Sequence, residues 1–381
     1  MSKIVPGNEA MVRDLKPQPK MPSNGCCLGC CGKASGPVDV RKIVEDGGKF
    51  LQTSDGRIVE YFVYGAEAAE RTLVQINGSM GTGWFCMSIP GMDARLKSLN
   101  LKAVSVTLAG HGYTSWQPNN FRVCDYAKDV EAVLAAEGIT GPLLVEGSSY
   151  GCALALACAR HFGERVTHLH VHTAYIPYEL RVELGMQGGD LKTEDDACLD
   201  KDTAWVDSCA SCCLHCSCTS LLCLLRCNPA LLDDAEDKAA ETAVAGYLEV
   251  KNRDVLRATR GGSTAWGIVH NVVGGVISKN WGFDLKTVSV LKVMISYNEG
   301  DPKCPPAHAL WLIEHFRSQG SSVVVTTPRA RSNRANTAGR CRRCSTVSSW
   351  RHSSPRERGL GLVCGRLRCS ECSSWVSTHF G

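Results

Sequence analysis

Apolar residues gather in short β-rich runs between Phe50 and Thr327, and turn-forming residues separate the runs. Two of these runs flank Asp55-Gly56 in "FLQTSDGRIVEYFVYG", and this dipeptide between β-rich segments is typical of a hairpin. Further runs that predict strands lie at 72–76, 101–108, 142–147, 166–176, 289–297 and 321–327. The pattern therefore predicts one large sheet.

Segments with helical periodicity lie between these runs. Asp125 can cap a helix in which apolar residues recur every three or four positions as far as Gly138. Helices are also expected over 149–162 and 305–316, the second with prolines in its first turn. Because strands alternate with helices, the pattern predicts an α/β fold with a parallel sheet covered on both faces.

This regularity stops near Pro177. Residues 178–285 hold charge-rich helical segments, notably 233–260, and seven cysteines between Cys209 and Cys227. We expect a helical cap here, inserted between the sixth and seventh strands. The predicted division of the chain is a flexible, cysteine-rich arm at 1–44, core at 45–177, cap at 178–285, core again at 286–327 and a tail at 328–381.

Charge divides the chain into two unlike parts. The net charge of the 381 residues is +4, but the tail from Pro328 carries eleven Arg, no Lys and two Glu, and so has a charge of +9. The rest of the chain is acidic, at −5. An acidic body offers no basic surface for nucleic acid, so we expect a small-molecule substrate. The tail has no amphipathic periodicity, and its composition is typical of disorder or of coding sequence read in a wrong frame or through an unspliced intron.

Cysteine usage and the absence of targeting signals bear on location. The sequence has no run of eighteen apolar residues and no signal-peptide pattern, so we expect a cytoplasmic protein whose 22 cysteines form no disulfide framework. Single cysteines in apolar surroundings are expected to pack as small hydrophobes; they are Cys86, Cys124, Cys152 and Cys158. The N-terminal "CCLGCC" (Cys26, Cys27, Cys30 and Cys31) leaves reversible palmitoylation and peripheral membrane association open.

The stretch "EGSSYGCALA", residues 146–155, carries the most specific chemical signal. Gly147-Ser148-Ser149-Tyr150-Gly151 fits the pattern G-x-S-x-G, with a predicted strand before it and a predicted helix after it. A sharp turn there holds the serine oxygen above the sheet in a strained conformation and needs small flanking residues. The helix N-terminus also favours developing negative charge. We interpret Ser149 as a nucleophile.

Three further stretches, in order along the chain, give a resemblance to the α/β-hydrolase superfamily from about Gly56 to Thr327. "INGSMGTG" resembles the loop after the family's third strand, "LAGHGYTS" the turn after its fourth, and "NEGDPKCPP" the loop that carries its acid. The resemblance implies an α/β-hydrolase fold: a mostly parallel central sheet with helices on both faces and a helical cap insertion. It also implies a serine hydrolase of the esterase or lipase type.

The resemblance assigns roles to the residues around the turn. Ser149 would attack a carbonyl and form an acyl-enzyme. The backbone N–H groups of Tyr150 and Ser79 would form the oxyanion hole. Gly147 and Gly151 would make the elbow turn.

Two further residues, Asn77 and Asp301, fall in the loops after the third and the seventh predicted strands. Asn77 stands where the family usually has a histidine, at a place that supports the loop. Asp301 in "EGDP" would orient the catalytic base, with Glu299 as the alternative.

No histidine stands where the resemblance places the base. That place follows the strand at 321–327, and "PRARSNRANTAGRCRRC" contains none. His308 and His315 belong to the preceding helix and His111 to the "GHG" turn. The remaining candidates are His352 and His379.

Two outcomes follow from this gap. Either His352 lies beside Ser149 and Asp301, or the chain as it stands is nearly inactive. The tail's lack of periodicity favours the second.

Two cysteine and histidine patterns suggest zinc but fit it poorly. Cys341-x2-Cys344 and Cys369-x2-Cys372 are separated by 24 residues, more than in usual zinc sites. His168, His170 and His172 alternate along a predicted strand and share one face, with no acidic partner nearby in the sequence. We expect no metal and no cofactor, because side chains and backbone donors suffice for serine hydrolysis. The predicted function is a serine hydrolase for a carboxylic ester or similar acyl substrate, with a non-catalytic binding protein of the same fold as the alternative.

Overall fold

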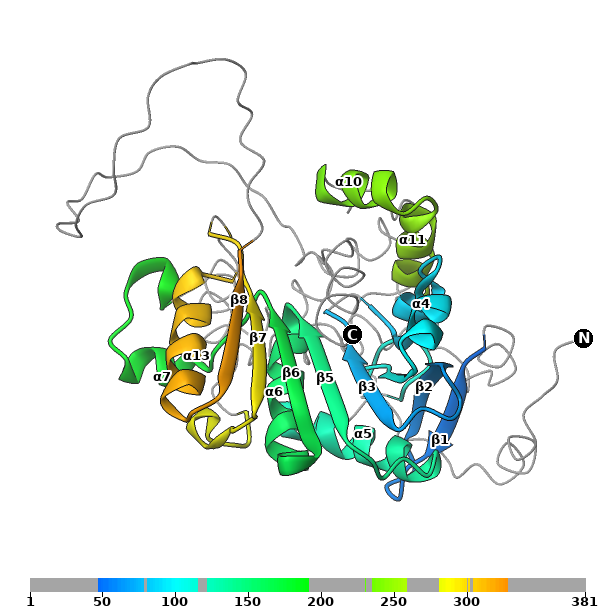
Figure 1. Cartoon of the computed structure of the whole chain (residues 1–381), viewed down its shortest axis with the longest axis horizontal. Coiled ribbons are helices and arrows are strands. Elements are labelled where there is room, and N and C mark those ends of the chain that lie inside the picture. Colours follow the sequence, from blue (N-terminus) through cyan, green and yellow to red (C-terminus); the bar gives the residue numbers. More distant parts are fainter. Residues whose placement is uncertain are drawn as a thin grey trace, which may run out of the picture.

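One sheet runs through the described part of the chain (Figure 1). The computed structural model describes residues 47–78, 81–115, 122–191, 230, 235–258, 281–299, 301 and 304–327. Within these ranges eight strands form a sheet in the order β1-β2-β4-β3-β5-β6-β7-β8. Their bounds are β1 Lys49–Gln52, β2 Ile58–Gly65, β3 Arg71–Ile76, β4 Leu101–Val106, β5 Leu143–Ser148, β6 Val166–His172, β7 Lys292–Ser296 and β8 Ser322–Thr326. The pairs β1–β2 and β2–β4 are antiparallel, and the other neighbours are parallel.

Every predicted strand is present, and the differences lie at strand ends. The hairpin at Asp55-Gly56 is confirmed, with Gly56 at a φ of 86° that favours glycine. β6 ends at His172, earlier than predicted, because Thr173 has a φ of 54° and so leaves the extended conformation. The strand pattern in the sequence thus located the sheet but not this turn.

Helices connect the parallel strands. They are α3 Gly83–Ser88, α4 Met92–Ser98, α5 Val123–Ala136, α6 Tyr150–Phe162 and α13 Pro306–Ser318. The predicted cap of α5 is wrong in one detail, because the helix begins at Val123 and Asp125 lies within its first turn. The Asp125 carboxylate accepts a 3.0 Å hydrogen bond from the backbone N–H of Arg122, so it still satisfies a donor at the helix N-terminus.

The two faces of the sheet are covered by different helices, as the alternation of strands and helices predicts. On one face, α5, α6 and α13 pack against the inward-pointing residues of the strands around Val145, Leu169 and Ile295. On the other face, α3 and α4 pack over Phe62 and Leu73. Alternate residues of each strand point to opposite faces, so both faces can be apolar at once.

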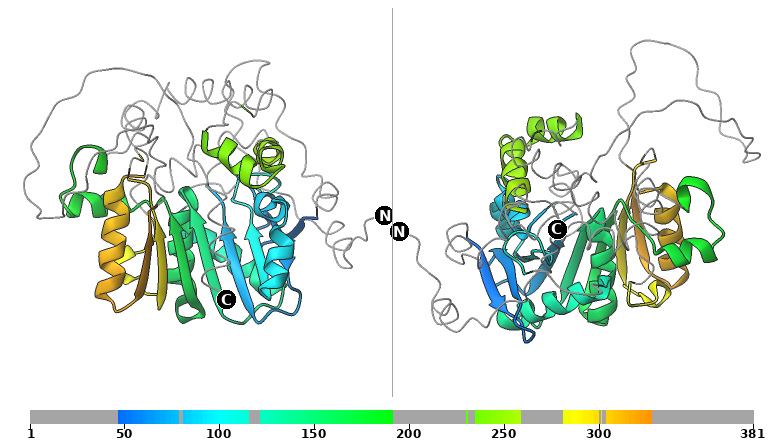
Figure 2. Two further views of the ribbon diagram at one scale, coloured as in Figure 1. Left: turned by 45° about the horizontal axis from the view of Figure 1, so that its top comes forward. Right: turned by 180° about the vertical axis from the view of Figure 1, so that it is seen from behind.

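The chain between β6 and β7 is helical where the structure describes it. It contains α7 Tyr178–Glu183, η2 Gly188–Asp190, α10 Ala235–Ala243, α11 Tyr247–Ala258 and η5 Leu285–Thr287. The charge-rich helical segments expected over 233–260 are α10 and α11 where the structure describes them, separated near Gly246 with a φ of 89°. Figures 1 and 2 place α11 next to α4 and α10 beyond α11, at the end of the sheet where β3 and β5 finish. The described helices of this segment therefore lie between the sixth and seventh strands in chain order.

Several sequence predictions lie outside the described residues. They concern the arm at 1–44, the cysteine cluster at 209–227 and the tail at 328–381. Among the described cysteines, Cys86, Cys152 and Cys158 are buried free thiols and Cys124 is half-buried. Burial raises the pKa of the Cys152 and Cys158 thiols, which keeps them protonated and apolar in character. No helix in the described ranges is long and apolar enough to cross a membrane.

Candidate active site

The turn between β5 and α6 has the geometry of a nucleophile elbow. Ser149 has φ 54° and ψ −125°, directly after the last residue of β5 and directly before the first residue of α6. Such a conformation costs a residue other than glycine about 1–3 kcal/mol and persists only where the surroundings enforce it. Within the described residues, the Ser149 hydroxyl has no hydrogen-bond partner. The turn therefore holds a strained serine at the carboxyl end of a central strand.

The two glycines of the elbow are required by close backbone contacts. A Cβ atom on Gly147 would lie 2.2 Å from the carbonyl oxygen of Gly151. A Cβ atom on Gly151 would lie 2.6 Å from the carbonyl oxygen of Ile76, at the end of β3. The prediction that small residues must flank the serine is thus explained by the approach of α6 to β5 and β3.

Thr173 is a second strained residue, and it contacts the first. It has a φ of 54°, follows β6 and is buried. The backbone N–H of Ser149 donates to the Thr173 hydroxyl at 3.2 Å and to the carbonyl of His172 at 2.9 Å. The Thr173 N–H in turn donates to the carbonyl of Ser296 in β7 at 2.8 Å. The end of β6 therefore fixes the backbone of the elbow.

The loop after β3 lies against the elbow. A Cβ atom on Gly78 would be 3.6 Å from the Cβ atom of Ser149, so the two backbones are in contact distance. Asn77 supports the loop as expected: its amide donates to the carbonyl of Thr82, and its oxygen accepts from the Cys86 thiol at 2.9 Å.

Of the two predicted oxyanion-hole residues, Tyr150 lies within the described residues and Ser79 does not. Ser79 lies outside the described residues, between Gly78 and Gly81, whose backbones are joined by a 3.2 Å hydrogen bond. Tyr150 is the first residue of α6, so its N–H belongs to the helix N-terminus beside the serine.

Asp301 follows β7 at the same edge of the sheet, with β6 between it and the elbow. It is half-buried, whereas Glu299 is exposed. Asp301 Oδ1 accepts a 3.1 Å hydrogen bond from the N–H of Cys304, and the Asp301 N–H donates to the carbonyl of Asn298 at 3.2 Å. This turn geometry orients Asp301 more firmly than Glu299.

No histidine in the described ranges is hydrogen-bonded to Ser149. His111 is buried with Nδ1 3.2 Å from the carbonyl of Ala109, and His308 and His315 contact the carbonyls of Asp190 and Val288. His352 and His379, the candidates for the base, lie outside the described residues. So do two other histidines, His215 and His270.

His170, the middle one of the alternating histidines of β6, belongs to a buried polar row across the sheet. His170 Nδ1 lies 3.4 Å from Glu146 of β5, and its Nε2 lies 3.0 Å from the Ser296 hydroxyl of β7. Glu146 also accepts from the Gln75 amide at 3.3 Å. The acidic neighbour of His170 therefore comes from the adjacent strand rather than from nearby sequence, where none was seen.

Comparison with known proteins places this geometry in a fold. The structure is similar to an esterase (EaEST) from Exiguobacterium antarcticum, with a TM-score of 0.51 and 17% sequence identity over 73% of this chain and 90% of that one. It is also similar to MGS-M2, an alpha/beta hydrolase enzyme from a Medee basin deep-sea metagenome library, with a TM-score of 0.50 and 13% identity over 73% of this chain and 89% of that one. The chain has the α/β-hydrolase fold. No protein-family model and no curated protein sequence matches it.

In this α/β-hydrolase fold, the insertion reaches the loop after β3 through residues that the sequence did not single out. Asp254 and Arg257 of α11 are buried. The Asp254 carboxylate accepts hydrogen bonds from Thr82, and the Arg257 guanidinium donates one to Glu60 of β2. Burial raises the pKa of Asp254 to about 7, although its hydrogen bonds from Thr82 and the charge of Arg257 lower it. The only sequence signal was two opposite charges one helical turn apart, which more often mark a solvated face.

Proposed function

We propose that this chain is a serine hydrolase that acts on a carboxylic ester or a similar acyl substrate through an acyl-enzyme. The observation that carries the proposal is the conformation of Ser149, at φ 54° in a strand–turn–helix whose glycines admit no side chain. Strain of this kind between a strand and a helix is a known feature of nucleophile elbows. Two structural neighbours are described as an esterase and as an alpha/beta hydrolase enzyme, which agrees with this proposal.

The proposed reaction has two steps. In the first, the Ser149 oxygen attacks the ester carbonyl while its proton passes to a base, and the alcohol leaves with a proton from that base. In the second, water attacks the acyl-enzyme and releases the carboxylic acid. The negative charge on the carbonyl oxygen would be stabilised by the N–H groups of Tyr150 and Ser79.

The base is assigned to His352, oriented by Asp301. Hydrogen-bonded turns hold Asp301 at the carboxyl edge of the sheet, which supports its role as the residue that orients the base. If the tail does not bring His352 to Ser149, the serine is an unassisted hydroxyl, and loss of the base in a serine hydrolase costs on the order of 10⁶-fold in kcat. The rate of this chain therefore depends on one histidine.

The alternative function is a non-catalytic binding protein with the same fold. The absence of a hydrogen-bonded histidine at Ser149 among the described residues favours it. A binding protein would have no need of a strained serine, whose conformation is costly to maintain.

An experiment with added imidazole separates these cases. The purified full chain is mixed with a short-chain aryl ester, with and without imidazole, and Ser149→Ala is the matched control for solution hydrolysis. A hydrolase gives a rate that depends on Ser149, either without imidazole or once imidazole replaces a missing base. A binding protein gives equal rates for the parent and Ser149→Ala at every imidazole concentration.

A further inference from the structure

Helix α11 of the insertion places two charged side chains inside the protein. Asp254 and Arg257 are one helical turn apart and so share a face. Their exposed fractions are 2% and 3%, respectively. Charged side chains are seldom buried to this extent unless they are paired, and both have specific partners far away in the sequence.

The partner of Asp254 is Thr82. One carboxylate oxygen accepts from the backbone N–H of Thr82 at 2.9 Å, and the other accepts from its hydroxyl at 2.5 Å. The same hydroxyl accepts from the N–H of Trp84 at 3.2 Å and so caps α3. Thr82 therefore connects α11 and α3 to the loop after β3 through its hydrogen bonds.

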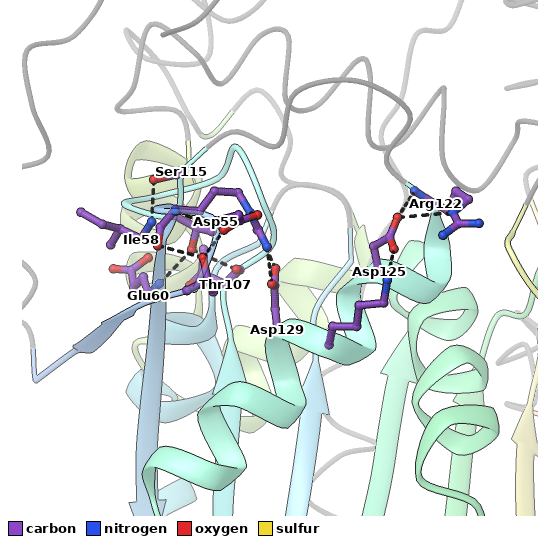
Figure 3. A network of polar contacts seen from close by, with 12 residues as sticks. Asp55, Ile58, Glu60, Thr107, Ser115, Arg122, Asp125 and Asp129 are labelled. Atoms are coloured by element: carbon purple, nitrogen blue, oxygen red, sulfur yellow. Dashed lines mark hydrogen bonds and ion pairs between the residues drawn. The ribbon is translucent and has the colours of Figure 1, made fainter. Parts of the chain in front are cut away.

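The partner of Arg257 is Glu60, which is fully buried in β2. The guanidinium also lies over the rings of Phe62 and Tyr113, at 5.3 and 5.0 Å from their centroids. Next to this pair, the turn after β4 is fixed to β2, since the Ser115 hydroxyl accepts from the N–H of Ile58 at 2.8 Å (Figure 3). Arg257 thus docks α11 on a rigid part of the core.

Thr82 is connected to the nucleophile by a short chain of contacts. Its carbonyl accepts from the Asn77 amide, and the Gly81 N–H donates to the carbonyl of Gly78. Gly78 in turn lies against Ser149. A shift of Thr82 therefore moves the loop that touches the serine.

We propose that Asp254 is a positioning residue: by holding Thr82, and through it Asn77 and Gly78, the docked helix α11 sets how closely the backbone after β3 approaches Ser149. The catalytic part of this inference rests on the proposed function. The positioning part rests on the contacts of Thr82 alone. The charged groups around the Asp254 carboxylate are Arg257 on the same helix and Glu60 on β2.

The position of Asp254 also gives the contact a pH dependence. Docking of α11 removes the carboxylate from water and raises its pKa to about 7, so the docked helix binds a proton more tightly than an undocked, hydrated one. Docking is therefore most favoured below about pH 4, weakens as the pH rises from 4 to 7, and changes little above pH 7. The loop should loosen over the same range.

Hydrogen–deuterium exchange of peptides that span 74–86 tests the positioning role in the full-length chain. Asp254→Asn resembles the protonated carboxyl, with one acceptor and one donor. It is expected to keep the loop protected without the loss that the parent shows between about pH 4 and 7. Asp254→Ala removes both contacts and is expected to exchange about tenfold faster at Thr82, which corresponds to about 1.4 kcal/mol. The matched control is Asp93→Ala, because Asp93 also accepts a backbone N–H from another element, that of Gly65, but lies outside this loop.

A second pair of variants tests the same contact in case Asp254→Ala does not fold. Thr82→Val removes only the hydroxyl and Thr82→Ser restores it, so the first is expected to speed exchange of the loop and the second to rescue it. Ser149-dependent acylation by an aryl ester should fall about a hundredfold in Asp254→Ala and recover in Asp254→Asn.

The Ser149→Ala chain should keep the same pH-dependent exchange, because the contact does not involve the serine. If the parent chain showed no Ser149-dependent acylation but normal protection of the loop, the result would count against the proposed function and not against the positioning role. Unchanged loop exchange in folded Asp254→Ala and Thr82→Val chains would overturn the positioning role.

Discussion

The backbone N–H of Ser149 lies 3.2 Å from the hydroxyl oxygen of Thr173, and both residues have a φ of 54°. Two strained residues at the ends of adjacent strands therefore hold each other. The Thr173 hydroxyl also donates to the carbonyl of His172 at 2.6 Å, so its lone pairs point toward the elbow. This contact fixes the direction in which the serine is presented.

Thr173→Val should slow Ser149-dependent acylation about tenfold, because it removes the acceptor while it keeps the shape of the side chain. The loss of one buried hydrogen bond should cost about 1 kcal/mol of unfolding free energy. Thr173→Ser should restore the rate. Thr167→Val is the control, since that hydroxyl bonds to the carbonyl of Leu143 at the other end of the same strand. Equal rates in Thr173→Val and the parent would remove Thr173 from the elbow.

The elbow glycines should not tolerate a methyl group. Gly147→Ala places a Cβ atom 2.2 Å from a backbone oxygen, so α6 must move away from β5. We expect a loss of about 1–3 kcal/mol or more in unfolding free energy, measured by urea titration. Gly189→Ala, where a Cβ atom would meet nothing within 4 Å, should have little effect. A stable Gly147→Ala chain would mean that the packing of α6 on the strand is looser than described.

Arg257→Met should destabilise the chain by about 3–5 kcal/mol, because it leaves the Glu60 carboxylate buried without its partner. The double variant Glu60→Gln/Arg257→Met should recover much of that loss. Lys97→Met, which breaks an exposed pair with Asp93, should change the unfolding free energy by less than about 1 kcal/mol. Chemical denaturation of five chains gives the values: the parent, Arg257→Met, Glu60→Gln, the double variant and Lys97→Met. Additive effects of the two single changes would show that Glu60 and Arg257 are not coupled.

Asp254 should make the chain less stable as the pH rises. Its pKa is raised from 3.8 to about 7 in the folded state, chiefly by burial, so the folded chain holds this proton more tightly than the unfolded one. The contribution is fully present below about pH 4 and is lost by pH 7, on the order of 4 kcal/mol in all. The difference in unfolding free energy between Asp254→Asn and the parent should therefore grow over that range.

The sign of this effect can be checked with Asp93→Asn. The Lys97 amine and the Gly65 N–H hold the pKa of Asp93 below its ordinary value, so its contribution is lost as the pH falls. The two difference curves should slope in opposite directions. A flat curve for Asp254→Asn would mean that the carboxylate is hydrated in the folded chain.

The sequence located the sheet and the elbow because both depend on local patterns. Alternation of apolar runs with helical segments marked each strand, and G-x-S-x-G between a strand and a helix marked Ser149. The ends of strands were less certain, since Thr173 takes a left-handed conformation that its residue type does not announce.

The residues that support the elbow could not be found in this way, because their partners are distant. Asp254 and Thr82 are 172 positions apart and Arg257 and Glu60 are 197 apart. Their helix was interpreted as a charge-rich segment, and nothing in a single sequence distinguishes a buried charge from a solvated one. Glu146 and His170 illustrate the same limit, since the pairing arises only when β5 and β6 come into register.

The most direct test of Ser149 as the nucleophile is acylation followed by peptide mass spectrometry. The full chain, Ser149→Ala and His352→Ala are each incubated with a short-chain aryl ester over a series of imidazole concentrations, and the peptide that contains residue 149 is examined for the acyl group. We expect the acyl group on Ser149 in the parent. If it forms without imidazole, His352 is the base, and His352→Ala should lose it until imidazole is added. If it forms only with imidazole, His352→Ala should behave as the parent does. An unmodified Ser149 peptide, with equal ester hydrolysis by the folded parent and Ser149→Ala at every imidazole concentration, would contradict the proposed hydrolase.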